Sequence, residues 1–155
     1  MRGKPVTKRL IAADPKFQRV DIAKLINKVM RQGKKTIAQK IVYGALEYIS
    51  NKTKQDPLEI YDTAMRNISP NLEVKGKRIG GANYQVPIVV TGDRKIILAH
   101  RWLIEATSHR KGMATHKALG EEILAAAKNE GEAIKKREDV QRMAEANRAF
   151  AHYRW

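Results

Sequence analysis

The sequence has no cysteine among its 155 residues. This absence excludes disulfides, thiolate zinc sites and a thiol nucleophile, and it fits a reducing compartment. Long apolar runs are missing too: no stretch approaches the ~18 consecutive apolar residues of a spanning helix, and the first residues lead into no apolar signal region. We therefore expect a soluble protein that stays inside the cell.

Patterns that would indicate catalysis or metal binding are also missing. Residues 33–36 resemble the end of a phosphate-binding loop, but a lysine stands where the motif needs its first glycine, and a helix precedes it. His109 and His116 are seven residues apart with no cysteine or neighbouring carboxylate to complete a site. Glu121 and Glu122 should point to different sides of a helix. We expect no catalytic residue, no metal and no cofactor.

The sequence does have a large excess of positive charge. It contains 31 Lys and Arg against 16 Asp and Glu, a formal net charge of +15. The excess is local: residues 1–35 carry a net +9 and residues 70–110 a net +4, whereas residues 36–69 and 111–130 are balanced. Such a charge predicts a polyanionic partner. Nucleic acid is the commonest, and a membrane surface is the competing one.

Hydrophobic spacing predicts a mainly α protein. Residues 1–19 have no apolar period and contain Pro5 and Pro15, which indicates a basic arm that becomes ordered only on its partner. Apolar residues then recur at helical intervals in six segments. We expect the first helix to run from Asp21 to a stop at Gly33, and the second from about Thr36 to Ser50 with Ile37 and Ile41 facing inward. The next three begin at caps and run from Asp56 to Ser69, from Asp93 to about His109 and from Thr115 to Asn129. The last runs from Glu132 to about Arg148.

The segment between the third and fourth helices changes to a period of two. Leu72 and Val74 alternate with polar residues, and so do Tyr84, Val86 and the positions that follow, on either side of two glycines. This pattern predicts a β-hairpin. A ribbon of two strands is marginal alone, so we expect it to project from the helical body, with an ordinary surface hairpin as the alternative to a cationic ribbon that contacts phosphates.

The expected architecture is therefore one domain over residues 1–155, a bundle of about six helices with one projecting β-hairpin and a basic N-terminal arm. The helix after Asp93 is apolar nearly all round and should lie at the centre, with Trp102 in the core. The last helix has only a thin apolar stripe of Val140, Met143 and Ala144, and the aromatic tail after it has no obvious core to fill. The parts are arm 1–19, body 20–70 and 92–130, hairpin 71–91, and C-terminal helix and tail 132–155.

Several strings of the sequence resemble one family. These are GKK after an amphipathic helix followed by IVYGAL, the hairpin KRIGGANYQVP, the Arg101-Trp102 pair and the ending KKREDVQRMAEANRAFAHYRW. Together they resemble bacterial small-subunit ribosomal protein seven over nearly the whole chain. The resemblance implies a bundle of six helices with a projecting β-hairpin, which agrees with the periodicity.

The resemblance also implies a function. It implies a primary binder of the 3′ major domain of small-subunit ribosomal RNA that nucleates assembly of the subunit head. Exit-site transfer RNA and the messenger exit path would be nearby, and ribosomal proteins nine and eleven would be neighbours. No membrane and no homo-oligomer are expected. The location would be the cytoplasmic ribosome, with an organellar ribosome as the alternative.

Carried over position by position, the resemblance implies two sets of binding residues. The set facing ribosomal RNA would be Arg2, Lys4, Lys8, Arg9, Lys34, Lys35, Lys75, Lys77, Arg78, Gly80, Gly81, Arg94, Lys95 and Arg101. The set near transfer RNA or docking on a partner would be Arg78, Gly80, Gly81, Ala82, Tyr84, Phe150, His152, Tyr153, Arg154 and Trp155. We hypothesise that arm, loop and hairpin form one continuous cationic surface.

Two other classes of protein are open to test. A DNA-binding architectural protein would place the basic hairpin in a groove, but such proteins usually dimerise, and the amphipathic faces show no obvious dimer seam. An enzyme acting on nucleic acid would need convergent acids, bases or a metal site, and the sequence shows none. The ribosomal RNA-binding protein is the favoured class.

Overall fold

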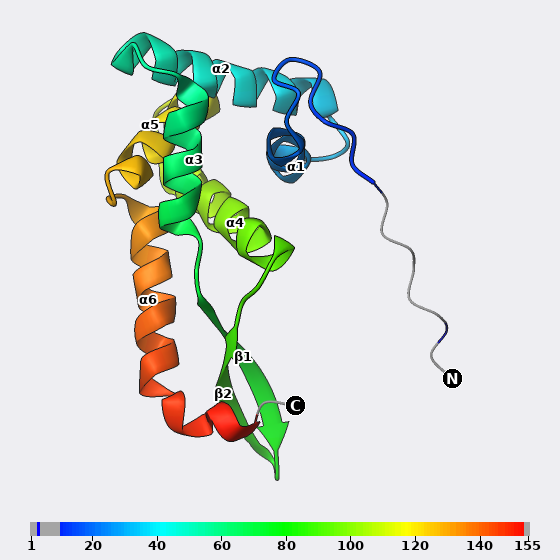
Figure 1. Cartoon of the computed structure of the whole chain (residues 1–155), viewed down its shortest axis with the longest axis vertical. Coiled ribbons are helices and arrows are strands. Elements are labelled where there is room, and N and C mark those ends of the chain that lie inside the picture. Colours follow the sequence, from blue (N-terminus) through cyan, green and yellow to red (C-terminus); the bar gives the residue numbers. More distant parts are fainter. Residues whose placement is uncertain (1–2, 4–9, 154–155) are drawn as a thin grey trace.

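A computed structural model describes residue 3 and residues 10–153 of the chain. Six of the expected site residues lie outside the described residues: Arg2, Lys4, Lys8, Arg9, Arg154 and Trp155. The elements are α1 (Val20–Val29), α2 (Lys35–Thr53), α3 (Pro57–Ile68), β1 (Leu72–Ile79), β2 (Ala82–Val89), α4 (Asp93–His109), α5 (Thr115–Ala127), α6 (Glu132–Ala146) and the 3-10 helix η1 (Arg148–Tyr153). The expected mainly α fold with one antiparallel hairpin is confirmed (Figure 1).

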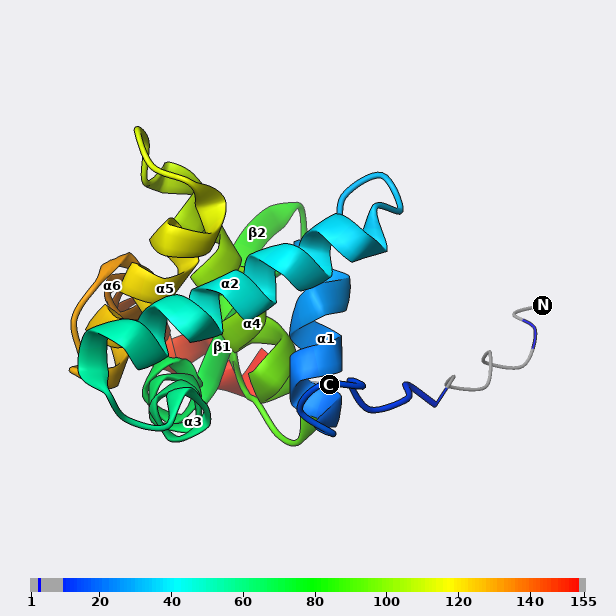
Figure 2. The same ribbon diagram turned by 90° about the horizontal axis from the view of Figure 1, so that it is seen from above.

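Helix α4 lies at the centre of the helical body, as expected. It packs against α1, α3, α5 and α6, and Leu98, Ala99, Trp102 and Leu103 on it are buried. Figure 2 shows α2 lying across the body, with α1 under its first turns and α3 near its last ones. The core is therefore formed mainly by helix-on-helix contacts.

The buried face of α2 differs from the expected one at its start. Ile37 is 50% exposed, and Ala38 is buried in its place. The stripe that follows is Val42, Ala45, Leu46 and Ile49, all buried. Residues on one face of a helix are spaced by three or four, so the burial of Ala38 and Val42 turns Ile37 outward. The inward placement of Ile37 was wrong.

The third helix begins and ends as its sequence predicts. The Asp56 carboxylate accepts a hydrogen bond from the backbone N–H of Leu58 at 2.9 Å, and Pro57 is the first helical residue. The helix ends before Ser69, whose extended backbone satisfies the proline that follows. Local chemistry alone is sufficient here, because both signals act within a few residues.

Other predicted helix ends were wrong. Helix α1 ends at Val29, and Gly33 lies four residues later in the loop with a φ of +72°. Asp93 and Thr115 are the first residues of their helices and not the caps, since Gly92 and Ala114 hold those positions with no side-chain cap. Helix α6 ends at Ala146, within two residues of the expected end, and the chain then tightens into η1.

Part of the expected arm is anchored on the helical body. Asp14 is buried, and its carboxylate accepts hydrogen bonds from the backbone N–H of Lys16 and of Phe17, both at 3.1 Å. The Tyr43 hydroxyl of α2 donates to the same carboxylate at 2.7 Å, and burial together with Asp14 raises the pKa of Tyr43 to about 12. The expectation that all of 1–19 orders only on a partner is therefore wrong for residues 14–17.

The hairpin turns at Gly80 and Gly81, where φ is +56° and +91°. These are conformations that residues other than glycine rarely adopt, so the turn requires both glycines. The hairpin extends beyond the helices in Figure 1, and α6 runs beside it. Segment η1 packs on β2, so the ribbon is supported by its own chain.

Gly120 lets α5 approach α2 closely. A β-carbon there would lie 2.7 Å from Cδ1 of Tyr48 and 3.2 Å from the carbonyl oxygen of Ala45. The glycine that weakens the helix in isolation is thus required by its packing.

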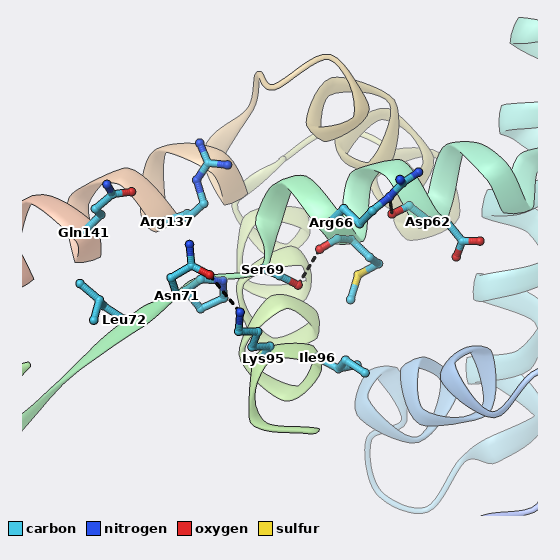
Figure 3. A pocket seen from close by; sticks show the side chains of 11 residues that line it. Asp62, Arg66, Ser69, Asn71, Leu72, Lys95, Ile96, Arg137 and Gln141 are labelled. Atoms are coloured by element: carbon cyan, nitrogen blue, oxygen red, sulfur yellow. Dashed lines mark hydrogen bonds between the residues drawn. The ribbon is translucent and has the colours of Figure 1, made fainter. Parts of the chain in front are cut away.

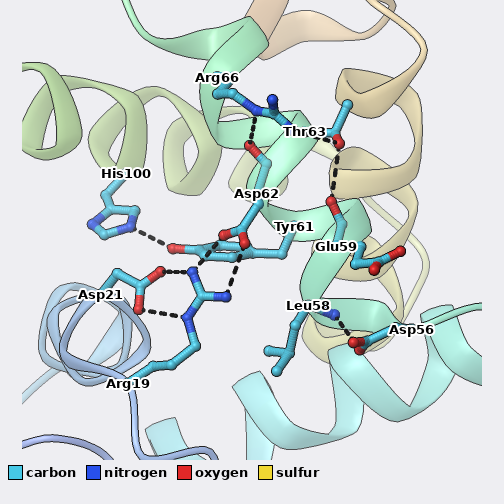
Figure 4. Close-up of polar contacts among 10 residues, drawn as sticks. All are labelled: Arg19, Asp21, Asp56, Leu58, Glu59, Tyr61, Asp62, Thr63, Arg66 and His100. Atoms are coloured by element: carbon cyan, nitrogen blue, oxygen red, sulfur yellow. Dashed lines mark hydrogen bonds and ion pairs between the residues drawn. The ribbon is translucent and has the colours of Figure 1, made fainter.

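A polar cluster joins α1, α3 and α4 at the edge of the core (Figure 4). Arg19 donates to the carboxylates of Asp21 and Asp62, which ties the start of α1 to α3. Beneath it the hydroxyl of Tyr61 lies 2.7 Å from Nε2 of His100, and both side chains are buried. Burial lowers the pKa of His100 from its ordinary value of 6.5 to about 4, although the Asp21 charge opposes this.

The low pKa of His100 predicts that the free energy of folding depends on pH. Below pH 6.5 the unfolded chain binds a proton at this residue, whereas the folded chain does not until about pH 4. We therefore expect a loss of about 3 kcal/mol of folding free energy from this residue as pH falls through that window. Urea unfolding over a pH series should show that component in the original chain and lose it in His100→Met. Equal pH slopes in both chains would contradict the prediction.

The described part of the chain contains no helix that is both long and apolar enough to cross a membrane.

Candidate nucleic-acid interface

The loop between α1 and α2 presents the expected lysines. Gln32 and Gly33 both adopt positive φ, and the backbone N–H of Lys34 donates to the carbonyl of Arg31 at 3.0 Å. This tight turn leaves Lys34 and Lys35 exposed at the start of α2, and none of the described carboxylates pairs with them. The two ammonium groups are therefore available to neutralise phosphates.

An open groove of about 520 Å³ lies beside this loop. Its lining combines exposed apolar side chains, Ile37 and Met113, with the basic residues Arg31, Lys34 and Arg110. A groove of this kind can accept the face of an unstacked base while Arg31 and Lys34 hold its phosphate, since Arg110 is paired with Glu122. Sequence reasoning missed Arg31 and Met113 as site candidates, because the groove joins loops far apart in the chain.

The hairpin cations are less available than a charge count suggests. Glu73 of β1 is buried, and it pairs with Nζ of Lys75 at 3.1 Å and with Nη2 of Arg94 at 2.7 Å. Burial alone would oppose ionisation, but the hydrogen bonds from Arg94 and Lys75 hold the pKa of Glu73 below its ordinary value. One carboxylate thus offsets part of the charge of two expected phosphate ligands.

The outer part of the hairpin divides its cations between two roles. Nζ of Lys77 donates to the carbonyl of Tyr153 at 3.2 Å, so this residue helps to hold the tail on the ribbon. Arg78 is exposed next to the glycine turn and pairs with none of the described carboxylates. Among the described hairpin residues, Arg78 is thus the cation best placed for a ligand at the tip.

The three basic residues expected on α4 point to different places. Arg94 is held by Glu73, whereas Nζ of Lys95 donates to Oδ1 of Asn71 at 2.9 Å, at a separate pocket. Arg101, seven residues after Arg94, is exposed on the same side of the helix as Arg94. The structure therefore separates Lys95 from the other two.

Helix α1 adds basic residues beside α4 that sequence reasoning did not include. Nζ of Lys24 pairs with Asp93 at the start of α4 at 2.9 Å, which brings the two helices together, and Lys28 is exposed one turn further along. Lys24, Lys28 and Arg31 follow one another at intervals of four and three residues. That helical spacing, which continues from α1 into the loop at Arg31, was the sequence signal that could have identified them.

The tail aromatics pack on the hairpin. The Tyr84 ring centroid lies 5.1 Å from that of Phe150 and 5.5 Å from that of Tyr153, and the His152 ring is tilted against that of Tyr153 with centroids 4.0 Å apart. The described part of the tail has no buried residue, but it has a partner within the chain that the sequence did not indicate, because its rings contact Tyr84 of β2. Phe150 and Tyr153 stay half-buried and His152 is exposed, so a ring surface remains available for a base or a partner.

The expected cations do not form one cluster. Figure 1 places the loop between α1 and α2 and the tip of the hairpin at opposite ends of the molecule, with α4 between them. A ligand that touches Lys34 and Arg78 together must extend along the whole body. A folded polynucleotide has that reach, whereas a small anion does not.

The chain was compared with known proteins. The profile of the ribosomal protein S7p/S5e family matches residues 1–148. The small ribosomal subunit protein uS7 of Thermotoga maritima is 58% identical over 155 residues, covering 100% of both chains. The protein of the same name from Dictyoglomus thermophilum is 56% identical over 154 residues, covering 99% of each. The resemblance seen in the sequence is confirmed, and the chain belongs to the ribosomal protein S7p/S5e family.

Proposed function

We propose that this chain is a structural constituent of the small ribosomal subunit that binds ribosomal RNA and carries out no catalysis. The relatives that match it over its full length bear the name of a small ribosomal subunit protein. The main support for RNA binding is that the chain has a net charge of +15 and exposes four cations along its length, namely Lys34, Lys35, Arg78 and Arg101. The location of the protein is then the cytoplasmic ribosome.

The finer proposal concerns which RNA is bound and what surrounds the protein. It is a primary binder of the 3′ major domain that nucleates assembly of the head. Exit-site transfer RNA and the messenger lie near the hairpin tip and the tail, and ribosomal proteins nine and eleven are neighbours. The exposed cations at the first loop and at the hairpin tip support a role in assembly. A body with contacts at both ends can hold separate RNA helices in a fixed arrangement.

Binding would then rest on shape more than on base edges. The loop cations hold one segment of backbone, Arg78 and the glycine turn approach another, and α4 with Lys28 spans the distance between them. Secondary-structure elements position these groups, since α2 and α4 pack in the helical body and the hairpin is supported by α6 and η1. A rigid set of phosphate contacts selects an RNA by the positions of its backbones.

The test is binding of the purified chain to a 3′ major domain fragment, with excess duplex DNA as competitor, over a series of salt concentrations. We expect binding that survives the competitor and whose log affinity falls steeply with log salt, because phosphate contacts release counterions. Loss of binding in the presence of duplex DNA, or an affinity that does not respond to salt, would overturn the proposal.

A further inference from the structure

A second polar pocket lies away from the loop and the hairpin tip. It has a volume of about 910 Å³ and forms where the end of α3, the start of β1, the start of α4 and the side of α6 meet (Figure 3). Helices α3 and α6 carry none of the residues expected to face RNA. Of the described residues expected to face RNA, Lys95 of α4 is the one that lines this pocket.

Three cations line this pocket: Arg66 of α3, Lys95 of α4 and Arg137 of α6. Arg66 is exposed and makes only long contacts, 3.4 Å to the carbonyl of Asp62 and 3.4 Å to the hydroxyl of Thr63. The one carboxylate in the lining is Asp62, which is already engaged by Arg19. The pocket therefore has an excess of positive charge.

Arg137 is incompletely satisfied where it stands. One terminal nitrogen donates to the carbonyl of Asn67, and the other lies 3.5 Å from a Glu138 oxygen. Its Nε is buried and has no hydrogen-bond partner among the described residues. Nε and the second terminal nitrogen form one edge of the guanidinium, the edge that matches the two oxygens of a carboxylate. A bound carboxylate would supply that edge with acceptors.

Apolar side chains lie between the cations. Met65, Pro70, Leu72 and Ile96 line the same pocket, and Leu72 and Ile96 are only half-buried. RNA could place an unstacked base on this surface, as at the groove beside the first loop, and competition with oligouridylate distinguishes that occupant from a peptide. A peptide with acidic and apolar side chains in alternation would pair with the cations and bury the apolar surface as well.

We propose that this pocket is a docking site for an acidic peptide segment of a partner protein, with one carboxylate on Arg137 and a second near Arg66 and Lys95. Apolar side chains between those carboxylates lie on Leu72 and Ile96. The inference does not rest on the proposed function, because Arg66 and Arg137 are not among the residues expected to touch RNA and Lys95 is, among the described residues, the one lining residue shared with that set.

The probe for the test is a fluorescein-labelled, end-capped peptide of sequence Glu-Leu-Glu-Leu, added to the full chain carrying ¹⁵N-labelled arginine. We expect saturable binding, read by fluorescence anisotropy, with a shift of the Arg137 Nε–H resonance. Arg66→Gln should weaken binding about tenfold, because it removes one charge-assisted hydrogen bond. Arg142→Gln is the matched control, since Arg142 is exposed on the same helix as Arg137 and does not line the pocket.

Three results would overturn the inference. The first is equal binding of a Gln-Leu-Gln-Leu peptide, which would show that the carboxylates are not recognised. The second is an equal loss in Arg66→Gln and Arg142→Gln, which would indicate general charge attraction. The third is that oligouridylate displaces the peptide and shifts the Arg137 Nε–H resonance at a lower concentration than the peptide does, which would assign the pocket to RNA. RNA-fragment binding by Arg66→Gln should stay unchanged throughout.

Discussion

Replacement of Glu122 with alanine should lower the free energy of unfolding by about 3 kcal/mol. Glu122 is fully buried on α5, and its Oε2 accepts hydrogen bonds from Nη2 of Arg110 at 2.7 Å and from Nε at 3.0 Å. Its Oε1 accepts from the backbone N–H of Ala133 at 3.0 Å. The alanine would leave the buried N–H unsatisfied and remove the partner of Arg110, whose side chain is about a third exposed and can turn to water.

This carboxylate replaces the cap that the last helix lacks. Gly131 precedes α6 with no side-chain cap, and a β-carbon at Gly131 would lie 2.7 Å from Oε1 of Glu122. The glycine and the glutamate therefore fit each other, and together they fix where α6 leaves the body. Since α6 leads to the tail that packs on the hairpin, we expect Glu122→Ala to loosen the tail as well.

Glu121→Ala provides the control at the adjacent position. Glu121 accepts hydrogen bonds from the Tyr48 hydroxyl and, at 2.5 Å, from Lys52, on the partly exposed side of the helix. Its loss should cost less than about 1 kcal/mol, because water can replace the partners. Urea unfolding followed by circular dichroism measures both variants. A cost for Glu122→Ala no larger than that for Glu121→Ala would refute the assigned role of the buried carboxylate.

Combined replacement of Lys34, Lys35 and Arg78 with alanine should weaken binding to the 3′ major domain fragment by roughly 100-fold near 0.1 M salt, if each phosphate contact contributes about 1 kcal/mol. The slope of log affinity against log salt should fall by up to about three units. Filter binding over a salt series gives both quantities.

A second triple variant separates local contacts from total charge. Lys128→Ala, Lys135→Ala and Arg142→Ala remove the same charge from three exposed positions in the C-terminal third of the chain, away from the loop and the hairpin turn. We expect a small loss of affinity from this variant. If the two triple variants lose affinity equally, the loop and hairpin contacts proposed here are refuted, although binding by net charge would remain.

Some features could be predicted because their causes act over a few residues. The cap by Asp56 and the proline after it start α3, two glycines make the hairpin turn, and the spacing of apolar residues identifies most of the core. The divergence of Glu121 and Glu122 follows from helix geometry and is confirmed by their separate partners. The positions of the exposed lysines in the first loop belong to this class as well.

Local sequence patterns were sufficient to predict the mainly α fold with a hairpin, the exposure of Lys34 and Lys35, and the family. Packing of distant segments sets which charges are neutralised and which side chains meet. Examples are Glu73 with Lys75 and Arg94, Asp93 with Lys24, Tyr84 with the tail, and Glu122 with the start of α6. The difference lies in the sequence separation of the residues that interact. Helix and turn preferences depend on neighbours in the chain, whereas ion pairs and ring contacts depend on where packing brings distant segments together.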